Sequence, residues 1–177
     1  MEHTETYPLT LSCLQADYAN KSTLRQLLEL YKYDFTAYDP EDVNESGLYE
    51  YRDLDSYWNV PGHYPFLLRA DGKLAGFALI RRFEADSGSG HEMVEFFVLK
   101  KYRGYGLGRA AAQRLFAAFP GAWKLSVMEN NAPALAFWQR AIFSCPAASD
   151  HIERREEDWE GPVLQFEVCK SDAPPNK

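Results

Sequence analysis

The sequence predicts one α/β (α+β) domain, in which a central mixed, mostly antiparallel β-sheet carries helices on both faces. Two observations lead to this fold class. Strand-like runs come first along the chain, two strand–helix pairs follow, and strands return at the end. In the middle, a glycine-rich turn joins an apolar run to an amphipathic pattern, as where a strand leads into a helix. We expect the domain to cover residues 1–170, and a disordered, proline-containing tail to cover residues 171–177.

The first half of the chain predicts an edge strand, a helix and a hairpin. Residues 9–14 alternate as an edge strand does. Ser22 can cap the helix, and Asp39-Pro40 ends it. The apolar face of this helix repeats at spacings of three and four: Leu24, Leu27, Leu28, Tyr31 and Phe35. Strands over 64–70 and 73–82 are joined by Asp71-Gly72, a dipeptide typical of tight hairpins.

The second half predicts the strand–helix pairs and a closing hairpin. Residues 86–90 (Asp-Ser-Gly-Ser-Gly) are expected to form a flexible loop. The elements expected after it are a strand over 91–98, a helix over 107–119, a strand over 123–128, a helix over 132–142 capped by Asn131, and strands over 151–156 and 163–169 around a turn at 159–162.

The glycine-rich turn has the chemistry of an anion site. It contains Gly104, Gly106 and Gly108, which let the backbone approach a ligand closely. The free N–H groups and the dipole at the start of the following helix favour a phosphate there. Arg103 and Arg109 add full positive charges. The spacing fits neither a dinucleotide fingerprint nor a Walker loop. The turn therefore predicts binding of a phosphorylated cofactor, and the alternative is an ordinary tight turn between a strand and a helix.

Two motifs resemble the GNAT superfamily of N-acetyltransferases. Arg103-x-x-Gly106-x-Gly108 is similar to its acetyl-CoA motif, and Asn131-x-x-Ala134-x-x-Phe137-Trp138 is similar to its second signature. The resemblance implies a GNAT-like fold whose splayed strands form the CoA cleft, with acetyl-CoA as cofactor. The cofactor-binding residues it implies are Phe97, Val98, Arg103, Gly104, Tyr105, Gly106, Leu107, Gly108, Arg109, Asn131, Ala134, Phe137 and Trp138.

The catalytic base is expected to be a carboxylate, because an amine must lose a proton before it attacks a thioester. Glu92 and Glu95 lie on the strand where the family often places such a base, and Glu95 is favoured because it is nearer the loop. Three residues apart on a regular strand, they should face opposite sides, so only one could reach the cleft. The alternative is a surface-paired or buried structural carboxylate.

The resemblance is incomplete at two catalytic positions. Some family members place a glutamate where Ser126 stands. Many use a tyrosine as general acid where Trp138 stands, and an indole N–H only donates hydrogen bonds. Lys100 also replaces a frequent proline, and Ile142-Phe143 replaces Gly-Phe. These departures leave open an alternative to an enzyme function: a GNAT-like sensor or interaction module that binds acyl-CoA with little turnover.

Charge and aromatic residues are concentrated in residues 31–58. This segment contains eight acidic and two basic residues, a net charge of −6 in a chain of net charge −7, and eight aromatic residues. In the resembled family this region lines the acceptor side, so it suits a cationic acceptor through steering and cation–π contacts. The alternative is a solvated acidic surface with aromatics that pack onto the sheet. The sequence has no basic stretch, so a nucleic-acid partner is not expected.

Composition sets the remaining expectations. The sequence contains no run of 18 apolar residues, so no membrane span is expected. Residues 1–5 do not resemble a signal peptide. Cys13, Cys145 and Cys169 are expected to be reduced core thiols of a cytoplasmic protein. The four histidines lack metal-ligand spacing, so no metal site is expected.

The function expected is that of an acyltransferase (EC 2.3.1 type). It would be an acetyl-CoA-dependent N-acetyltransferase of an aminoglycoside-like, polyamine-like or peptide amine, acting as a monomer or homodimer.

Overall fold

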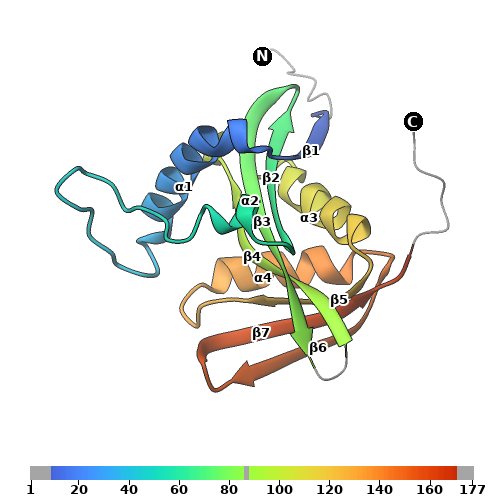
Figure 1. Ribbon diagram of the computed structural model, residues 1–177. Helices are drawn as coiled ribbons and strands as arrows, with labels where there is room; N and C mark the ends of the chain where they lie inside the picture. Colours follow the sequence, from blue (N-terminus) through green and yellow to red (C-terminus); the bar gives the residue numbers. More distant parts are fainter. Residues whose placement is uncertain (1–8, 86–87, 171–177) are drawn as a thin grey trace, which may run out of the picture.

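A single mixed sheet organises the protein, whose computed structural model describes residues 9–85 and 88–170. Seven strands run in the order β1-β2-β3-β4-β5-β7-β6 (Figure 1). Their bounds are β1 Leu11–Gln15, β2 His63–Ala70, β3 Lys73–Ala85, β4 Gly88–Val98, β5 Gly121–Ser126, β6 Ala148–Glu156 and β7 Trp159–Val168. Neighbouring strands are antiparallel except β4 and β5, which are parallel. The predicted mixed, mostly antiparallel sheet is confirmed.

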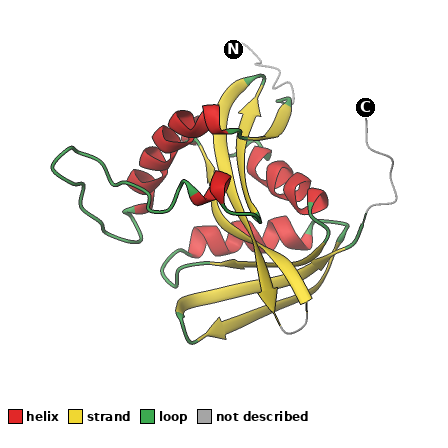
Figure 2. Cartoon of the chain, viewed as in Figure 1, coloured by secondary structure: helices red, strands yellow, loops and turns green. Residues whose placement is uncertain are grey.

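Helices cover both faces of this sheet (Figure 2). On one face lie α1 (Lys21–Phe35) and the short α2 (Ser56–Asn59), and on the other lie α3 (Leu107–Ala118) and α4 (Ala132–Phe143). Alternation along β3 separates the two cores: Phe77 packs with Leu24 of α1, whereas Ala78 packs with Phe116 of α3. The long segment between α1 and α2 projects away from the sheet (Figure 1).

The element boundaries differ from the sequence expectation in small ways. Asp71 and Gly72 have φ of 48° and 76°, so the predicted hairpin has the two left-handed residues of a type I′ turn. The helix α1 begins at Lys21 after Asn20, so Ser22 lies inside its first turn and does not cap it. It ends at Phe35, before Asp39-Pro40. Neither α2 nor the 3₁₀ turns η1 (Tyr18–Asn20) and η2 (Lys100–Tyr102) was predicted.

Two glycine-containing stretches expected to be turns lie in strands instead. Gly90 is part of β4, where a Cβ would lie 2.6 Å from the Ala122 carbonyl oxygen. Gly161 is part of β7, where a Cβ would lie 2.0 Å from the Val127 carbonyl oxygen. These glycines let neighbouring backbones approach closely and do not reverse the chain. The β6–β7 turn is therefore at residues 157–158, and residues 88–90 of the expected loop belong to β4.

Some expectations fall on residues outside the described ranges. They are the loop positions Asp86 and Ser87, the N-terminal residues 1–5 and the tail over 171–177. Of the three cysteines, Cys145 is buried and Cys13 is half-buried, but Cys169 is exposed and is not a core thiol. Across residues 9–85 and 88–170, none of the helices combines the length and apolarity needed to traverse a bilayer.

Candidate functional site

A large cleft opens where β4 and β5 stop pairing. The two strands are paired only from Gly90–Ala122 to Glu92–Lys124. Beyond this point, Leu125 and Ser126 of β5 pair only with β7. The resulting cleft has a volume of about 1070 Å³, and its walls come from α1, β4, the glycine-rich loop, β5 and α4. A cleft of this size accommodates a cofactor as large as CoA.

The glycine-rich loop forms the end of the cleft at the start of α3. Gly106 is the N-cap of α3, with φ of 77°, and a Cβ there would meet nothing within 4 Å. The first N–H groups of α3 have no partner within the helix, so they are available to an anion at this open position. Gly108 serves a different purpose, because a Cβ there would lie 3.3 Å from the Phe137 ring. It lets α3 approach α4 closely.

The two arginines of the loop play different parts. Arg103 donates from Nε to the Val98 carbonyl oxygen at 2.7 Å and from its guanidinium to Asp34 at 2.6 Å. Lys100 also pairs with Asp34, at 3.1 Å. Arg103 therefore braces the loop against β4 and α1. Arg109 is exposed and lines the cleft, which makes it the better placed of the two for a ligand phosphate.

The α4 side of the cleft combines a polar cap with an aromatic wall. Asn131 is 7% exposed, and its side-chain oxygen accepts from the Ala134 N–H at 3.1 Å. Phe137 stacks on Phe96 of β4, with ring centroids 5.8 Å apart. Trp138 meets Phe96 edge-on at 5.1 Å and is 8% exposed. Trp138 is thus part of the core as well as of the cleft wall.

Most of the expected cofactor residues meet at this cleft. Those that line it are Phe97, Val98, Arg103, Gly104, Gly106, Gly108, Arg109, Asn131, Ala134, Phe137 and Trp138. Tyr105 is 64% exposed and Leu107 is buried in the core, and neither lines the cleft. Their roles in cofactor binding remain predictions.

A β-bulge brings both candidate bases to one face of β4. Leu79 pairs with Glu95 while the next residue, Ile80, pairs with Met93, so Val94 is an extra residue. The extra residue reverses the side-chain alternation between Glu92 and Glu95. Both glutamates consequently line the cleft. The expectation that they face opposite sides is wrong, because it assumed a regular strand.

The two glutamates nevertheless have different surroundings. Glu92 accepts from Arg81 at 2.6 Å and lies 4.0 Å from Lys124, so it is a paired carboxylate. Glu95 accepts from the Tyr31 hydroxyl at 2.5 Å and from the Tyr51 hydroxyl at 3.1 Å. Burial raises the pKa of Glu95, and the two phenol hydrogen bonds oppose that rise. Glu95 has no cationic partner at salt-bridge distance among the described residues.

The acidic segment is partly neutralised within the protein. Glu41 pairs with Lys32 at 2.5 Å, Asp55 pairs with Lys21, and Asp34 pairs with Lys100 and Arg103. Among acidic residues of the segment with no ion pair in the described structure, Asp39 alone lines the cleft. The wall is therefore less acidic than the sequence predicts.

Sequence reasoning missed Arg81, which lines the cleft as the partner of Glu92. Tyr31 and Asp34 belong to the segment expected on the acceptor side, but their bonds to Glu95 and Arg103 were not predicted. Asn130 donates to the Tyr38 carbonyl oxygen at 2.8 Å, which joins the loop before α4 to the segment after α1. The contacts of Tyr31, Asp34 and Asn130 link residues 64 to 92 positions apart, and no local pattern signals them.

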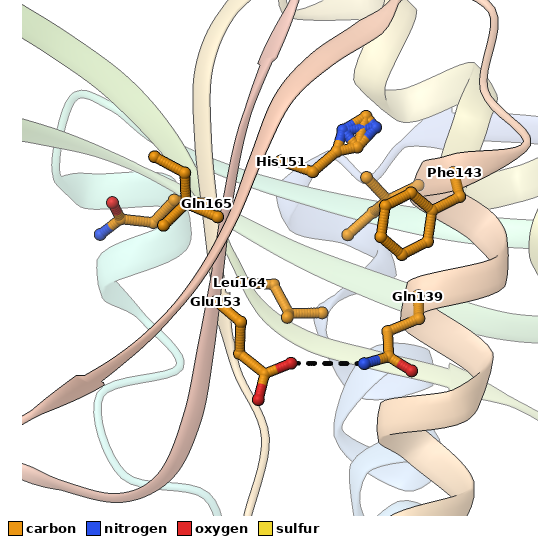
Figure 3. A pocket seen from close by; sticks show the side chains of 8 residues that line it. Gln139, Phe143, His151, Glu153, Leu164 and Gln165 are labelled. Carbon is orange, nitrogen blue, oxygen red and sulfur yellow. Dashed lines mark hydrogen bonds between the residues drawn. The ribbon is translucent and has the colours of Figure 1, made fainter.

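A second cavity lies between α4 and the β6–β7 hairpin. Figure 3 shows Gln139 and Phe143 facing Glu153 and His151, with a hydrogen bond between Gln139 and Glu153. Its volume is about 50 Å³, which is room for a few water molecules and far too little for a cofactor. The chemistry is therefore expected at the larger cleft.

Comparisons with known proteins agree with this geometry. An acetyltransferase from Thermus thermophilus is 18% identical over 91% of this chain and 97% of its own, with a TM-score of 0.66. Naa50 of Arabidopsis thaliana, in complex with the bisubstrate analogue CoA-Ac-MVNAL, is 18% identical over 88% and 97%, with a TM-score of 0.55. PaiA N-acetyltransferase of Thermoplasma acidophilum, in complex with coenzyme A, is 11% identical over 90% and 99%, with a TM-score of 0.59.

At these identities, the structural likeness shows a shared fold. No curated protein matches the sequence. The model of the Acetyltransferase (GNAT) family, however, matches residues 24–142, which include β4, the glycine-rich loop and all of α4 except its last residue. The expected family and fold are thereby confirmed: the chain belongs to the GNAT family of acetyltransferases, enzymes whose cosubstrate is acetyl-CoA.

Proposed function

We propose that the protein transfers the acetyl group of acetyl-CoA to a primary amine of a cationic acceptor, with Glu95 as the general base. The observation on which this rests is the placement of Glu95: a carboxylate with a raised pKa and no cationic partner among the described residues, inside a cleft that begins at the open N-terminus of α3. A base of this kind is matched to removing a proton near neutral pH.

The cleft residues fit the cosubstrate. Gly106 leaves open space in front of the α3 N–H groups, and Arg109 lies beside them, so this end would hold the pyrophosphate. The gap between β4 and β5 leaves strand edges free to receive the pantetheine amides. When bound, acetyl-CoA supplies an activated thioester. Asn131, Phe137 and Trp138 would form the opposite wall and exclude water.

Three features support a cationic amine acceptor. The segment over residues 31–58 gives this side a negative field, which attracts cations over a Debye length of about 8–10 Å. Asp39 reaches the cleft itself. Tyr31, Phe35 and Tyr38 present aromatic surface there. This chemistry matches a small polyamine-like or aminoglycoside-like amine, and it also matches a peptide amine. The bisubstrate analogue bound by Naa50 is a reason to include peptides among the candidate acceptors.

The test is release of free CoA thiol from acetyl-CoA with a panel of amines: spermidine, an aminoglycoside, a peptide with a free N-terminus, and an acidic amino acid as an anionic comparison. We expect turnover with cations that weakens as salt is raised. Asp39→Asn should raise the acceptor KM and spare that of acetyl-CoA. Asp42→Asn is the matched control, because Asp42 is exposed and does not line the cleft.

Preference for the anionic amine, or acceptor kinetics that do not depend on salt, would contradict the acceptor class. Binding of acetyl-CoA by calorimetry without thiol release for any amine would favour the alternative of an acyl-CoA-binding module with little turnover. That alternative draws its support from Ser126 and Trp138, which stand at two catalytic positions of the family.

A further inference from the structure

Both oxygens of the Glu95 carboxylate are held by phenols from separate parts of the chain. The Tyr31 hydroxyl, on α1, donates to Oε2 at 2.5 Å. The Tyr51 hydroxyl, in the segment between α1 and α2, donates to Oε1 at 3.1 Å. Each hydroxyl has one proton to donate, and each carboxylate oxygen keeps one lone pair for another partner. Two donors on two oxygens fix the plane of the carboxylate and not only its position.

The Tyr31 ring has little freedom to move. Its centroid lies 5.3 Å from that of Phe35, 5.7 Å from that of Phe77 and 5.7 Å from that of Phe97. Phe77 and Phe97 meet it edge-on. Such aromatic packing confines the ring beyond what simple burial does. The Tyr31 hydroxyl is therefore presented to Glu95 from a rigid helix–sheet interface.

Tyr51 reaches Glu95 through an unusual piece of backbone. Glu29 of α1 accepts from the Tyr49 N–H at 2.8 Å and from the Glu50 N–H at 2.9 Å, one bond to each carboxylate oxygen. Glu50 and Asp53, on either side of Tyr51, both have φ of 58°. A left-handed residue other than glycine is strained, and it persists only where its surroundings determine it. The strain is thus stored at the residues that present the Tyr51 phenol.

We propose that Tyr31 and Tyr51 form a phenol clamp: they are positioning residues that hold the Glu95 carboxylate in one orientation toward the acceptor amine, and Glu29 positions Tyr51. The inference rests on the proposed function, because it assigns a purpose to these contacts only if Glu95 is the base. It also couples the base to the segment over residues 36–55: a movement of that segment on acceptor binding would move Tyr51 and hence Glu95.

The charges around Glu95 set the expected direction of its titration. The pKa of Glu95 is raised by burial and by the Glu92 carboxylate, and it is lowered by both phenols and by Lys32. Tyr57 of α2 and Arg81 of β3 also face this cluster, and burial, with the nearby Glu95 carboxylate, raises the pKa of the Tyr57 phenol. Removing either phenol removes a hydrogen bond to the ionised carboxylate. The pKa of Glu95 should then rise further.

The experiment compares Tyr31→Phe and Tyr51→Phe with Tyr33→Phe, a control at a residue of α1 that is 67% exposed. Two readouts are taken: titration of the Glu95 side-chain carboxyl by ¹³C NMR, assigned with Glu95→Gln, and the pH dependence of kcat. We expect each clamp variant to move the Glu95 pKa and the acidic limb of kcat upward by about one unit, with the KM for acetyl-CoA unchanged. Tyr33→Phe should move neither.

Glu29→Gln tests the indirect part of the proposal. A glutamine side chain has only one oxygen, so it cannot accept from both backbone N–H groups as the carboxylate does. The backbone before Tyr51 therefore loses one of its two hydrogen bonds to residue 29. We expect a smaller upward shift than Tyr51→Phe gives, and no additional shift when Glu29→Gln is combined with Tyr51→Phe. A full additional shift in the double variant would show that Glu29 acts independently of Tyr51 and would overturn its positioning role.

The outcomes separate this inference from the proposed function. An unchanged or lowered Glu95 pKa in both Phe variants overturns the clamp, whatever the activity is. A raised pKa together with full activity of Glu95→Gln also overturns it, because the clamp would then hold a carboxylate that the reaction does not use. If no amine is turned over, the proposed function fails on the thiol assay alone, while the NMR titration still decides whether the phenols hold the carboxylate.

Discussion

Replacing Glu95 with glutamine is the sharpest single test of the site. Glutamine has the same shape and keeps one acceptor oxygen for the Tyr31 hydroxyl, which lies 2.5 Å from the carboxylate. Its amide group would face the Tyr51 hydroxyl, which can accept as well as donate. The change therefore removes the basicity of the side chain and leaves its packing and the nearby cleft wall intact.

The magnitudes follow from the surroundings of the carboxylate. Loss of a positioned base typically lowers the rate by about 10²–10⁴-fold, and the loss should shrink toward pH 10, where a lysine-like amine is increasingly deprotonated. Burial raises the pKa of Glu95, so its contribution to folding is full below its ordinary pKa and is lost as pH rises through the raised value. Glutamine avoids this loss, which amounts to roughly 1.4 kcal/mol for each pH unit by which folding raises the pKa.

The assay combines a pH–rate profile with thermal unfolding at pH 4 and pH 8. We expect Glu95→Gln to lower kcat at pH 7, to leave acetyl-CoA binding unchanged, and to raise the melting temperature at pH 8 but not at pH 4. Glu92→Gln is the matched control. The Glu92 side chain is 13% exposed and Arg81 is 49% exposed, so losing this charged hydrogen bond should lower stability by about 1–3 kcal/mol and change turnover only slightly. Collapse of activity in Glu92→Gln with none in Glu95→Gln would refute the assignment.

Three further changes test the cofactor side. Gly106→Ala places a Cβ at φ of 77° in open space, so it should cost about 1–2 kcal/mol of stability and weaken acetyl-CoA binding by calorimetry; unchanged binding in the folded variant would sink the assignment. Asn131→Ala should cost about 1 kcal/mol as a lost cap and also raise the KM for acetyl-CoA; a lower melting temperature with an unchanged KM would mean that the residue is a cap alone. Trp138→Tyr removes ring volume beside Phe96 and Phe137 and should destabilise by roughly 1–3 kcal/mol, while kcat measures whether a phenol there adds a general acid.

The fold was largely predictable because its signals are local. Periodicity located the strands and helices, and Asp71-Gly72 located the hairpin turn. Two of the errors arose at glycines that are required by a contact with a distant part of the chain. Gly90 and Gly161 resemble turn residues in the sequence, yet they lie in strands because a neighbouring backbone leaves no room for a Cβ. That reason depends on residues far away in the sequence, so the pattern around each glycine could not reveal it.

The part of the cleft wall formed by the glycine-rich loop and α4 was predictable for the same reason. The glycine-rich loop and the start of α4 are each contiguous in sequence, and most of the cofactor residues that the motifs imply line the cleft. The orientation of the two candidate bases, Glu92 and Glu95, was not predictable, because the extra residue at Val94 reverses the side-chain alternation between them. A bulge requires only one residue more on β4 than on β3, and nothing in the run from Glu92 to Glu95 signals it. Whether the bulge forms depends on how β4 pairs with β3.

The acceptor side shows why charge counts are a poor guide to recognition. Residues 31–58 carry a net charge of −6, but Asp34, Glu41 and Asp55 are paired within the protein. Asp34 serves the cofactor side, because it holds Arg103 and Lys100 beside the glycine-rich loop. Exposed pairs are individually weak, so the pairs do not remove the long-range field that steers a cation. Under the proposed function, close recognition would therefore fall to the few groups in the cleft that have no ion pair in the described part of the chain: Asp39, the aromatic rings of α1 and the held carboxylate of Glu95. The field would bring a cationic acceptor to the cleft, and these groups would decide which amine reaches the thioester.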